Sequence, residues 1–374
     1  MTTVPRGEKV QGRLLTAEAR AGERAGELIP EAHAGELIPG IEDDITVAHI
    51  ATKLTLRDMY VFSSVSRGWL QAIRSRRVYN ARLHHDSTET CVLLGFEKDN
   101  ISLCSVKDHS IRKLQQGREG CLLGILAPNG VVALDGRVYA VGPDGKLHVL
   151  DLAGQQQWKR CSKGEVVLST FELEVMDGKI YALAHCNTWR TPRPAYVFDL
   201  KQNTRSSIKP MPSTRFGHQV AAMGDELVVY GGIVSRNGLH FQHSYFLDVY
   251  HPVKDEWRAV ESFGRPDEML FVAQGRFYSM SAREIHVYDG SKNSWTCLHS
   301  FCFDADQSVE PIEVVAAGNE LLARVTWYTE ESRDSSCLFH CREFGGQNKE
   351  LLWHAVVVFP GIRWGNCLGP TVSL

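Results

Sequence analysis

Aromatic residues are missing from the first 59 positions of this 374-residue chain, although 34 Phe, Trp and Tyr residues occur from Tyr60 onward. Residues 1–36 consist mainly of Ala, Gly, Glu and Arg. A segment of this composition buries too little apolar surface to offset the entropy of ordering it. We therefore expect residues 1–36 to form a disordered arm.

Three further absences narrow the class of protein. No apolar run reaches the roughly 18 residues of a membrane span, and the N-terminal stretch has no signal-peptide core. The net charge is −3, without the basic excess of a generic nucleic-acid or membrane binder. Ten cysteines are too few for a disulfide scaffold of this length. We expect a protein of the cytoplasm, the nucleus or both, with free thiols and with neither nucleic acid nor membrane as partner.

Residues 37–84 have a helical pattern. Asp43 and Asp44 stand at a predicted helix start, where carboxylates favour the positive end of the helix dipole. Thr55 and Asp58 have capping-box spacing and predict the start of a second helix. Apolar residues then continue in steps of three and four, and the basic cluster Arg74, Arg76 and Arg77 is expected to close the last of three helices.

This short module has more large apolar side chains than three short helices can bury among themselves. A segment of this length also has too small a core to be stable without help from a neighbour or partner. The excess predicts an interface with another protein. The alternative is that these side chains pack on the domain that follows.

Residues 88–374 contain a repeated strand–turn–strand pattern. The two-residue turns lie 42, 46, 51 and 43 positions apart, and Asp-Gly between apolar runs is a strong hairpin signal. A period near 45 residues in a strand-rich chain predicts a β-propeller. The turns are Asp135-Gly136, Asp177-Gly178, Gly224-Asp225, Gln274-Gly275 and Gly318-Asn319.

The composition of the repeats indicates the type of propeller. Gly231-Gly232 follows an apolar strand, and a Trp follows a Tyr by seven residues twice, in Tyr250/Trp257 and Tyr288/Trp295. A hairpin of this kind pairs two large rings between blades. These features resemble kelch repeats, and the resemblance is clearest over residues 216–260.

The number of blades follows from a second motif. Arg118-Glu119-Gly120, Arg215-Phe216-Gly217 and Arg363-Trp364-Gly365 each open an apolar run, with glycines 97 and 148 residues apart. The last copy introduces the strand 367–374, which has no blade of its own, and 91–96 resembles a second strand that lacks its first. Joining the two would close a ring of six blades and remove the open edge.

The helical segment contains, in order, Leu37-Ile38-Pro39-Gly40-Ile41, Asp43-Asp44-Ile45, Leu54, Leu56 and Val65-Ser66-Arg67-Gly68-Trp69. Their order and spacing resemble the F-boxes of plant F-box/kelch proteins. Glu42 and Gly68 depart from that pattern, standing where a proline and a basic residue are usual. The chain is thus expected to be an α+β multidomain protein, with a disordered arm (1–36), a three-helix F-box (37–84) and an all-β kelch propeller (88–374). The resemblance implies the substrate-recognition subunit of a Skp/cullin/F-box ubiquitin ligase, which binds the Skp-type adaptor and, through it, cullin. The residues expected to bind the adaptor are Leu37, Ile38, Pro39, Ile41, Ile45, Leu54, Leu56, Val65 and Trp69.

The substrate is expected to be a protein held by loops of the propeller. Two irregular segments, 186–194 and 233–244, combine the aromatic and basic residues that are common at interfaces. The candidates for substrate contact are Trp189, Arg190, Arg193, Arg236, His240, Phe241 and His243.

No pattern of catalysis stands out. The chain lacks a phosphate-binding loop, a nucleophile elbow and a zinc-binding His-Glu-x-x-His motif. Cys337 and Cys341 would point to the opposite face of a strand from His340, so the three cannot share one ion. We expect no catalytic residue, no metal and no cofactor. The alternatives are a kelch scaffold without a ligase role and a kelch-type propeller enzyme.

Overall fold

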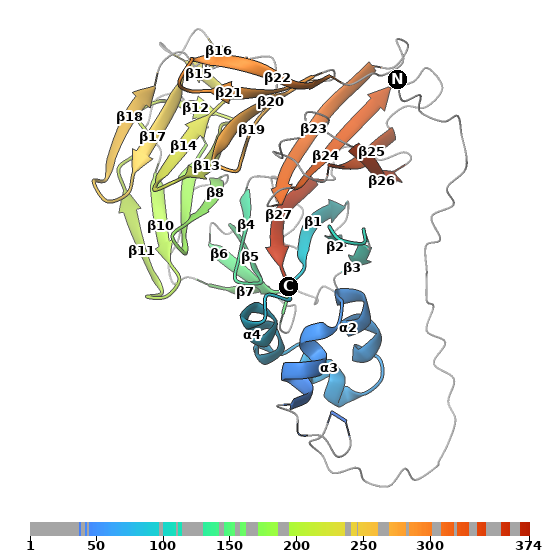
Figure 1. Cartoon of the computed structure of the whole chain (residues 1–374). Helices are drawn as coiled ribbons and strands as arrows, with labels where there is room; N and C mark the ends of the chain where they lie inside the picture. Colours follow the sequence, from blue (N-terminus) through green and yellow to red (C-terminus); the bar gives the residue numbers. More distant parts are fainter. Residues whose placement is uncertain are drawn as a thin grey trace.

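A computed structural model shows a helical module beside a propeller-like array of sheets (Figure 1). The predicted arm, residues 1–36, lies outside the described residues. The structure describes residues 37–38, 42, 45–96, 100–109, 111–113, 130–141, 146–153, 158–161, 171–185, 194–235, 241–244, 246–260, 269–281, 284–300, 308–317, 320–328, 335–341, 353–359 and 367–374.

The helical module, residues 45–86, contains three α-helices and two shorter helical segments. The segment that begins near Ile45 is a π-helical turn followed by a 3₁₀ turn, and three short α-helices come after it. A buried cluster of Val47, Ala51, Met59 and Val78 holds them together. The elements are η1 (Thr46–Ile50), η2 (Ala51–Lys53), α2 (Leu56–Ser63), α3 (Arg67–Ile73) and α4 (Arg76–His84).

The predicted capping box at the start of α2 is confirmed. The Thr55 hydroxyl accepts a hydrogen bond from the Asp58 backbone N–H at 3.1 Å, and the Asp58 carboxylate accepts one from the Thr55 N–H at 3.2 Å. Two otherwise unsatisfied amides of the first turn are thus paired. This geometry lowers the pKa of Asp58, because the ionised carboxylate accepts the hydrogen bonds from Thr55.

The expectation for Arg76 and Arg77 is wrong. Only Arg74 lies at the end of α3, whereas Arg76 and Arg77 begin the additional helix α4. Ser75 has an extended backbone between the two helices, and its side chain accepts a hydrogen bond from the Val78 N–H. An N-cap serine therefore starts a new helix where a single basic helix end is expected.

Among the described residues, the strand-rich part contains six four-stranded antiparallel sheets. Their strands are neighbours in the sequence with two exceptions: the last strand, Cys367–Ser373, joins the first, Thr90–Phe96, and Glu226–Tyr230 pairs with Leu247–His251 across two shorter strands. The first three sheets are β27 (Cys367–Ser373), β1 (Thr90–Phe96), β2 (Asn100–Ser105) and β3 (Ile111–Lys113); β4 (Val131–Leu134), β5 (Arg137–Val141), β6 (Leu147–Asp151) and β7 (Trp158–Arg160); and β8 (Phe171–Met176), β9 (Lys179–Ala184), β10 (Ala195–Asp199) and β11 (Thr204–Ile208).

The other three four-stranded sheets continue the series, and one small sheet accompanies them. They are β13 (Gln219–Met223), β14 (Glu226–Tyr230), β17 (Leu247–His251) and β18 (Glu256–Val260); β19 (Met269–Ala273), β20 (Arg276–Met280), β21 (Glu284–Asp289) and β22 (Ser294–Ser300); and β23 (Ser308–Ala317), β24 (Glu320–Tyr328), β25 (Ser335–Cys341) and β26 (Trp353–Phe359). The small three-stranded sheet is β12 (Arg215–Phe216), β15 (Ile233–Ser235) and β16 (Phe241–His243).

Four of the five predicted hairpin turns lie among the described residues, and all four join consecutive antiparallel strands. Asp135-Gly136, Asp177-Gly178 and Gln274-Gly275 have positive φ at both positions, and Gly224 has it at the first position of its turn. The fifth turn, Gly318-Asn319, lies outside the described residues. These conformations explain why Gly, with Asp or Gln, occupies the turns.

The strand exchange expected from the sequence is present. β27 pairs antiparallel with β1, from Thr90 opposite Ser373 to Gly95 opposite Cys367. Several first strands lie side by side: β27 beside β4, β4 beside β8 and β8 beside β13, while β19 lies beside β23 and β23 beside β27. Between the fourth and fifth sheets, the Tyr230 and Phe277 rings meet at 5.5 Å.

Two Tyr–Trp pairs lie across neighbouring strands of the sheets. Tyr250 lies opposite Trp257 across β17 and β18, with ring centroids 5.0 Å apart, and Tyr288 lies opposite Trp295 at 5.3 Å. The Tyr250/Trp257 pair packs against the preceding sheet through Tyr181. The rings thus fill the space between two sheets.

Gly231-Gly232 lets the small sheet approach the start of β13. Both residues have positive φ, and a Cβ on Gly232 would lie 2.7 Å from the Phe216 carbonyl oxygen and 2.8 Å from the His218 nitrogen. We predict that Gly232→Ala lowers the free energy of unfolding by about 2–4 kcal/mol. Gly231→Ala, where a Cβ meets nothing within 4 Å, should cost only about 1 kcal/mol from its φ. Urea unfolding of both variants measures the difference, and equal losses would contradict the steric account.

Candidate functional site

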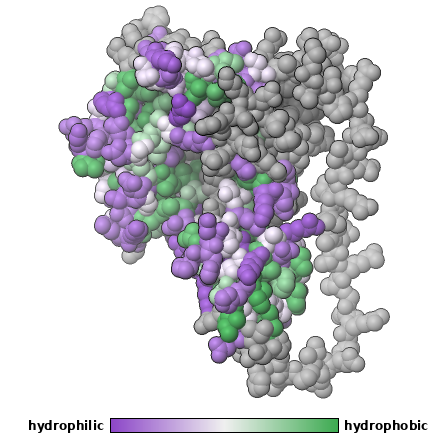
Figure 2. All heavy atoms as spheres, viewed as in Figure 1, coloured by the Kyte–Doolittle hydropathy of each residue, from purple (hydrophilic) through white to green (hydrophobic). Residues whose placement is uncertain are grey.

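Large apolar side chains are exposed on the helical module. Among the described residues with exposed large hydrophobic side chains, four of eight fall between positions 45 and 65. We call Ile45, Tyr60, Val61 and Val65 the exposed apolar set. Figure 2 shows hydrophobic residues gathered on the helical module at the lower end of the molecule. Such a concentration on so small a module indicates an interface.

Helix α2 produces this exposure because it turns only part of its apolar surface inward. Met59 is buried in the module's core, whereas Tyr60 and Val61 point outward and Val65 lies in the turn that ends the helix. Val61 and Val65 are 55% and 67% exposed. The sequence analysis missed Tyr60 and Val61, although the first aromatic residue of the chain was a visible signal.

The residues that were expected to bind the adaptor differ in their exposure to solvent. Ile45 and Val65 are exposed, whereas Leu37, Ile38, Leu54 and Leu56 are half-buried. Leu37, Leu54 and Leu56 pack against the module's core. Pro39 and Ile41 lie outside the described residues.

Trp69 lies inside the module. It is 4% exposed, and its ring meets Phe62 edge-on at a centroid distance of 4.9 Å. The Ser66 hydroxyl accepts a hydrogen bond from the Trp69 N–H and starts α3. Trp69 therefore supports α2 from beneath and does not lie on the module surface in this conformation.

The helical module is basic, unlike the chain as a whole. Residues 45–86 contain seven Lys and Arg against two Asp, a net charge of +5, whereas the full chain is at −3. Lys53, Arg57 and Arg67 are exposed next to or within the helices that carry the exposed apolar set. Basic residues around an apolar surface favour a partner with acidic groups around an apolar contact.

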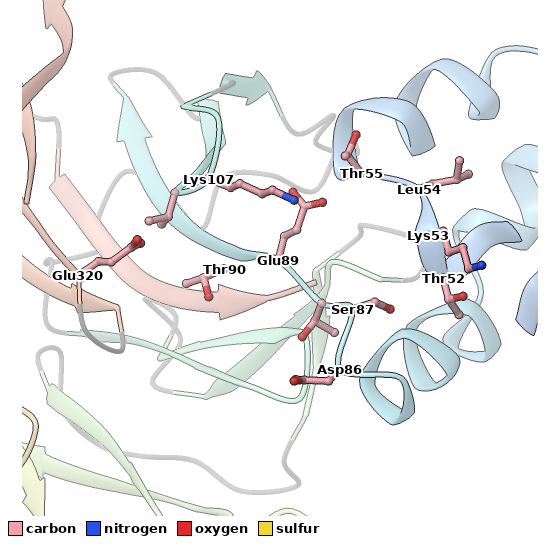
Figure 3. A pocket seen from close by; sticks show the side chains of 12 residues that line it. Thr52, Lys53, Leu54, Thr55, Asp86, Ser87, Glu89, Thr90, Lys107 and Glu320 are labelled. Carbon is pink, nitrogen blue, oxygen red and sulfur yellow. The ribbon is translucent and has the colours of Figure 1, made fainter. Parts of the chain in front are cut away.

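A cleft of ≈ 710 Å³ lies where the helical module meets the sheets (Figure 3). Thr52 and Lys53 line its wall on the helical side, Lys107 and Glu320 line the opposite wall, and Glu89 lies between them. Hydroxyls and charges of both signs are mixed here, so the lining does not favour a ligand of either charge.

Most of the candidates for substrate contact lie outside the described residues. This applies to Trp189, Arg190, Arg193, Arg236 and His240, while Phe241 and His243 form the ends of β16. His243 is exposed and pairs with Ile233. Ile233 in turn pairs with Phe216, an exposed aromatic residue that the sequence analysis did not select.

The small sheet that bears these residues is fixed by a buried ion pair. The fully buried Arg215 guanidinium lies 2.9 Å from the Asp248 carboxylate and donates hydrogen bonds to the carbonyl oxygens of Gly231 and Phe246. β15 and β16 lie at the end of the sheet array away from the helical module (Figure 1). A partner at this sheet would thus leave the module free.

Buried polar groups gather beneath Phe216. The Glu172 carboxylate is buried and lies 2.6 Å from His185 Nε2. The His218 ring is tilted against that of His185, with centroids 4.6 Å apart, and burial, followed by the nearby His185 and Arg215, holds the pKa of His218 well below its usual value. His218 is therefore neutral at pH 7.

Within the described part of the chain, no three His, Cys, Asp or Glu side chains are placed to hold a metal ion. Cys337, His340 and Cys341 follow one another on β25, with Cys341 buried. Among the described helices, none is long and apolar enough to cross a membrane.

Comparison with known proteins gives one family model within the strand-rich part and several relatives of low identity. The family model described as the KIB1-4 beta-propeller matches residues 153–295. An F-box/kelch-repeat protein of Arabidopsis thaliana is 25% identical over 293 residues, which cover 72% of this chain and 74% of that protein. The chain resembles the plant F-box/kelch-repeat proteins.

Two further relatives are similar over shorter regions. Another F-box/kelch-repeat protein of Arabidopsis thaliana is 24% identical over 159 residues, covering 41% of each chain. Kelch-like protein 26 of Danio rerio is 24% identical over 172 residues, covering 42% of this chain and 27% of that protein. In this chain, a β-propeller-like domain follows a few N-terminal helices.

One carboxyl group between two sheets gives a testable pH dependence. Burial raises the pKa of Glu174 on β8 to about 7, although backbone hydrogen bonds from Ala222 and Val175 oppose the shift. The residue as a whole is half-buried. Because the unfolded chain releases this proton near pH 4.5, stability falls as the pH rises from about 4.5 to 7.

We predict that Glu174→Gln raises the free energy of unfolding at pH 8 by about 1–3 kcal/mol and changes it little at pH 4.5. Urea unfolding at several pH values measures this. Glu256→Gln, at an exposed position of β18, serves as the control and should shift neither value. A Glu174→Gln effect that is equal at both pH values would contradict the assignment.

Proposed function

We propose that this chain is the substrate-recognition subunit of a Skp/cullin/F-box ubiquitin ligase. The observation that carries the proposal is the exposed apolar set on a small basic module, which lies apart from the small sheet at the other end of the molecule. The similarity to plant F-box/kelch-repeat proteins supports it. In this proposal the module binds a Skp-type adaptor and, through it, cullin, in the cytoplasm, the nucleus or both.

The six four-stranded sheets would form the six blades of a kelch propeller. The pairing of β27 with β1 would close the ring, because it supplies the first strand of a blade whose other strands come from the start of the domain. The side-by-side first strands support this arrangement. A closed ring leaves no open sheet edge to pair with other chains.

The chain itself would make and break no bond. A subunit that holds a protein substrate near a charged conjugating enzyme raises the effective concentration of the substrate lysine. The chemistry then belongs to the other subunits.

Binding of the adaptor would combine apolar burial with electrostatic attraction. Val61 and Val65 would be desolvated at the centre, with Arg57 and Arg67 nearer the rim. Rim charges change association rates more than affinities. The substrate would lie near Phe216 and His243, along with the substrate-contact residues that lie outside the described part of the chain.

We predict that Val61→Asp combined with Val65→Asp lowers adaptor affinity at least about 100-fold, because charges would be buried in an apolar contact. Both side chains are exposed, so the melting temperature should change little. Capture of the purified full chain on an immobilised Skp-type adaptor measures the loss. Val253→Asp is the matched control, since Val253 is 90% exposed on the turn between β17 and β18.

Unchanged capture of the double variant would contradict the proposed surface. Failure of the unaltered chain to bind any Skp-type adaptor would contradict the ligase role and favour a scaffold. Substrates are identified by affinity capture and mass spectrometry with the proteasome blocked. Proteins captured by the Val61→Asp/Val65→Asp variant but no longer degraded are the expected substrates.

A further inference from the structure

We propose that the helical module also acts as a clamp on the seam of the sheet array. The seam is the pairing of β27 with β1 together with the backbone pair of Glu89 and Leu374. The clamp residue is Arg82 of α4, which connects the module and the linker (residues 87–89) to the seam. The module and the seam are therefore stabilised as one unit. This role is independent of any adaptor.

Arg82 reaches three parts of the chain from one buried guanidinium group. Its side chain is 1% exposed. On the module side, Nη1 donates to the carbonyl oxygens of Ala51, at 3.4 Å, and Leu54. On the seam side, Nη2 donates to the Leu374 carbonyl oxygen at 3.5 Å and lies 3.8 Å from Glu89 Oε1.

Glu89 completes the connection. Its backbone N–H donates to the Leu374 carbonyl oxygen at 2.8 Å, and its carbonyl oxygen accepts from the Leu374 N–H at 2.9 Å. Its carboxylate accepts a hydrogen bond from the Leu56 N–H at 3.1 Å, at the start of α2. Glu89 thus pairs with Leu374, directly after β27, and also with the first turn of α2.

Apolar packing follows the same path. Leu56 packs against the module's core and also against a cluster that contains Leu374, Cys91 and Leu93. The two cores are therefore continuous at the seam. Removing Arg82 would loosen groups on both sides because they share this junction.

Burial of the charged Arg82 guanidinium costs free energy. This cost indicates that Arg82 serves to fix the positions of the groups around it. Burial lowers the pKa of Arg82, and this effect outweighs the attraction of Glu89. A buried ion pair is weak evidence for stability by itself, and its best-attested use is to specify one arrangement. Arg82 selects the arrangement in which Leu54, Glu89 and Leu374 meet.

Arg76 provides a matched control on the same helix. Its Nη1 donates to the Asp135 carbonyl oxygen at 2.7 Å and lies 3.7 Å from the Asp151 carboxylate, so it ties α4 to the β4–β7 sheet. It makes no hydrogen bond or ion pair with the described seam residues. Arg76→Met and Arg82→Met remove the same group from one helix at two different junctions.

Hydrogen exchange of the full chain, followed by mass spectrometry, tests the clamp. We expect Arg82→Met to speed exchange about tenfold or more in β27, β1 and α2 together. Arg76→Met should leave exchange in β27 and β1 within about twofold of the unaltered chain. Arg82→Lys keeps the positive charge but lacks the forked donors of the guanidinium group. It should therefore slow exchange in the seam strands and in α2 part of the way back to that of the unaltered chain.

Faster exchange in α2 with an unchanged seam would overturn the clamp, since Arg82 would then serve the module alone. Faster exchange in β27 after Arg76→Met, to the same degree, would also overturn it. If Arg82→Met does not fold, Arg82→Lys and Glu89→Gln replace it, and the clamp requires paired changes of smaller size in the seam and α2.

A second experiment rests on the proposed function. Binding that stabilises the module must also stabilise what is coupled to it. Adding a Skp-type adaptor should slow exchange in β27 of the unaltered chain, and do so less in Arg82→Lys. If the adaptor binds without slowing β27, the clamp is contradicted. If it does not bind, the proposed function fails while the comparison of Arg82 with Arg76 still decides the clamp.

Discussion

The guanidinium of Arg82 is closed off from solvent at the point where the helical module, the linker and the last strand meet. Its charge requires compensation there, and Glu89 together with carbonyl oxygens from both sides supplies it. Because these partners lie far apart in the sequence, the contact fixes how the module lies on the sheets. The orientation of the exposed apolar set relative to the small sheet depends on this junction.

The surfaces at the two ends of the molecule are held in place by different interactions. At the helical end, α2 leaves Val61 and Val65 in solvent while Trp69 fills the interior beneath Phe62, so the surface is apolar but firmly supported. At the other end, the buried Arg215–Asp248 pair holds the small sheet and the tight approach at Gly232. A flexible connection between two binding surfaces would lower the effective concentration that the proposed function requires.

Much of this architecture could be predicted from short-range sequence rules. The capping box at Thr55, the Tyr250/Trp257 and Tyr288/Trp295 pairs, and the Asp-Gly turns depend on residues a few positions apart. The pairing of β27 with β1 followed from repeat spacing, whereas the blade count and the ring remain proposals. Burial of polar residues could not be predicted. Glu172 and Arg82 have partners in other elements, and no local pattern separates them from solvent-facing residues. The exposure of Tyr60 and Val61 depends in the same way on how α2 is rotated.

The central claim is that the helical module of this chain binds a Skp-type adaptor by burying apolar surface. Titration calorimetry of the purified full chain with such an adaptor, repeated at several temperatures, tests it most directly. The account predicts one-to-one binding with a negative heat-capacity change, the mark of apolar burial. It also predicts slower association as salt is added, because the module carries a net charge of +5. Absence of binding, or binding without a negative heat-capacity change, would contradict the account.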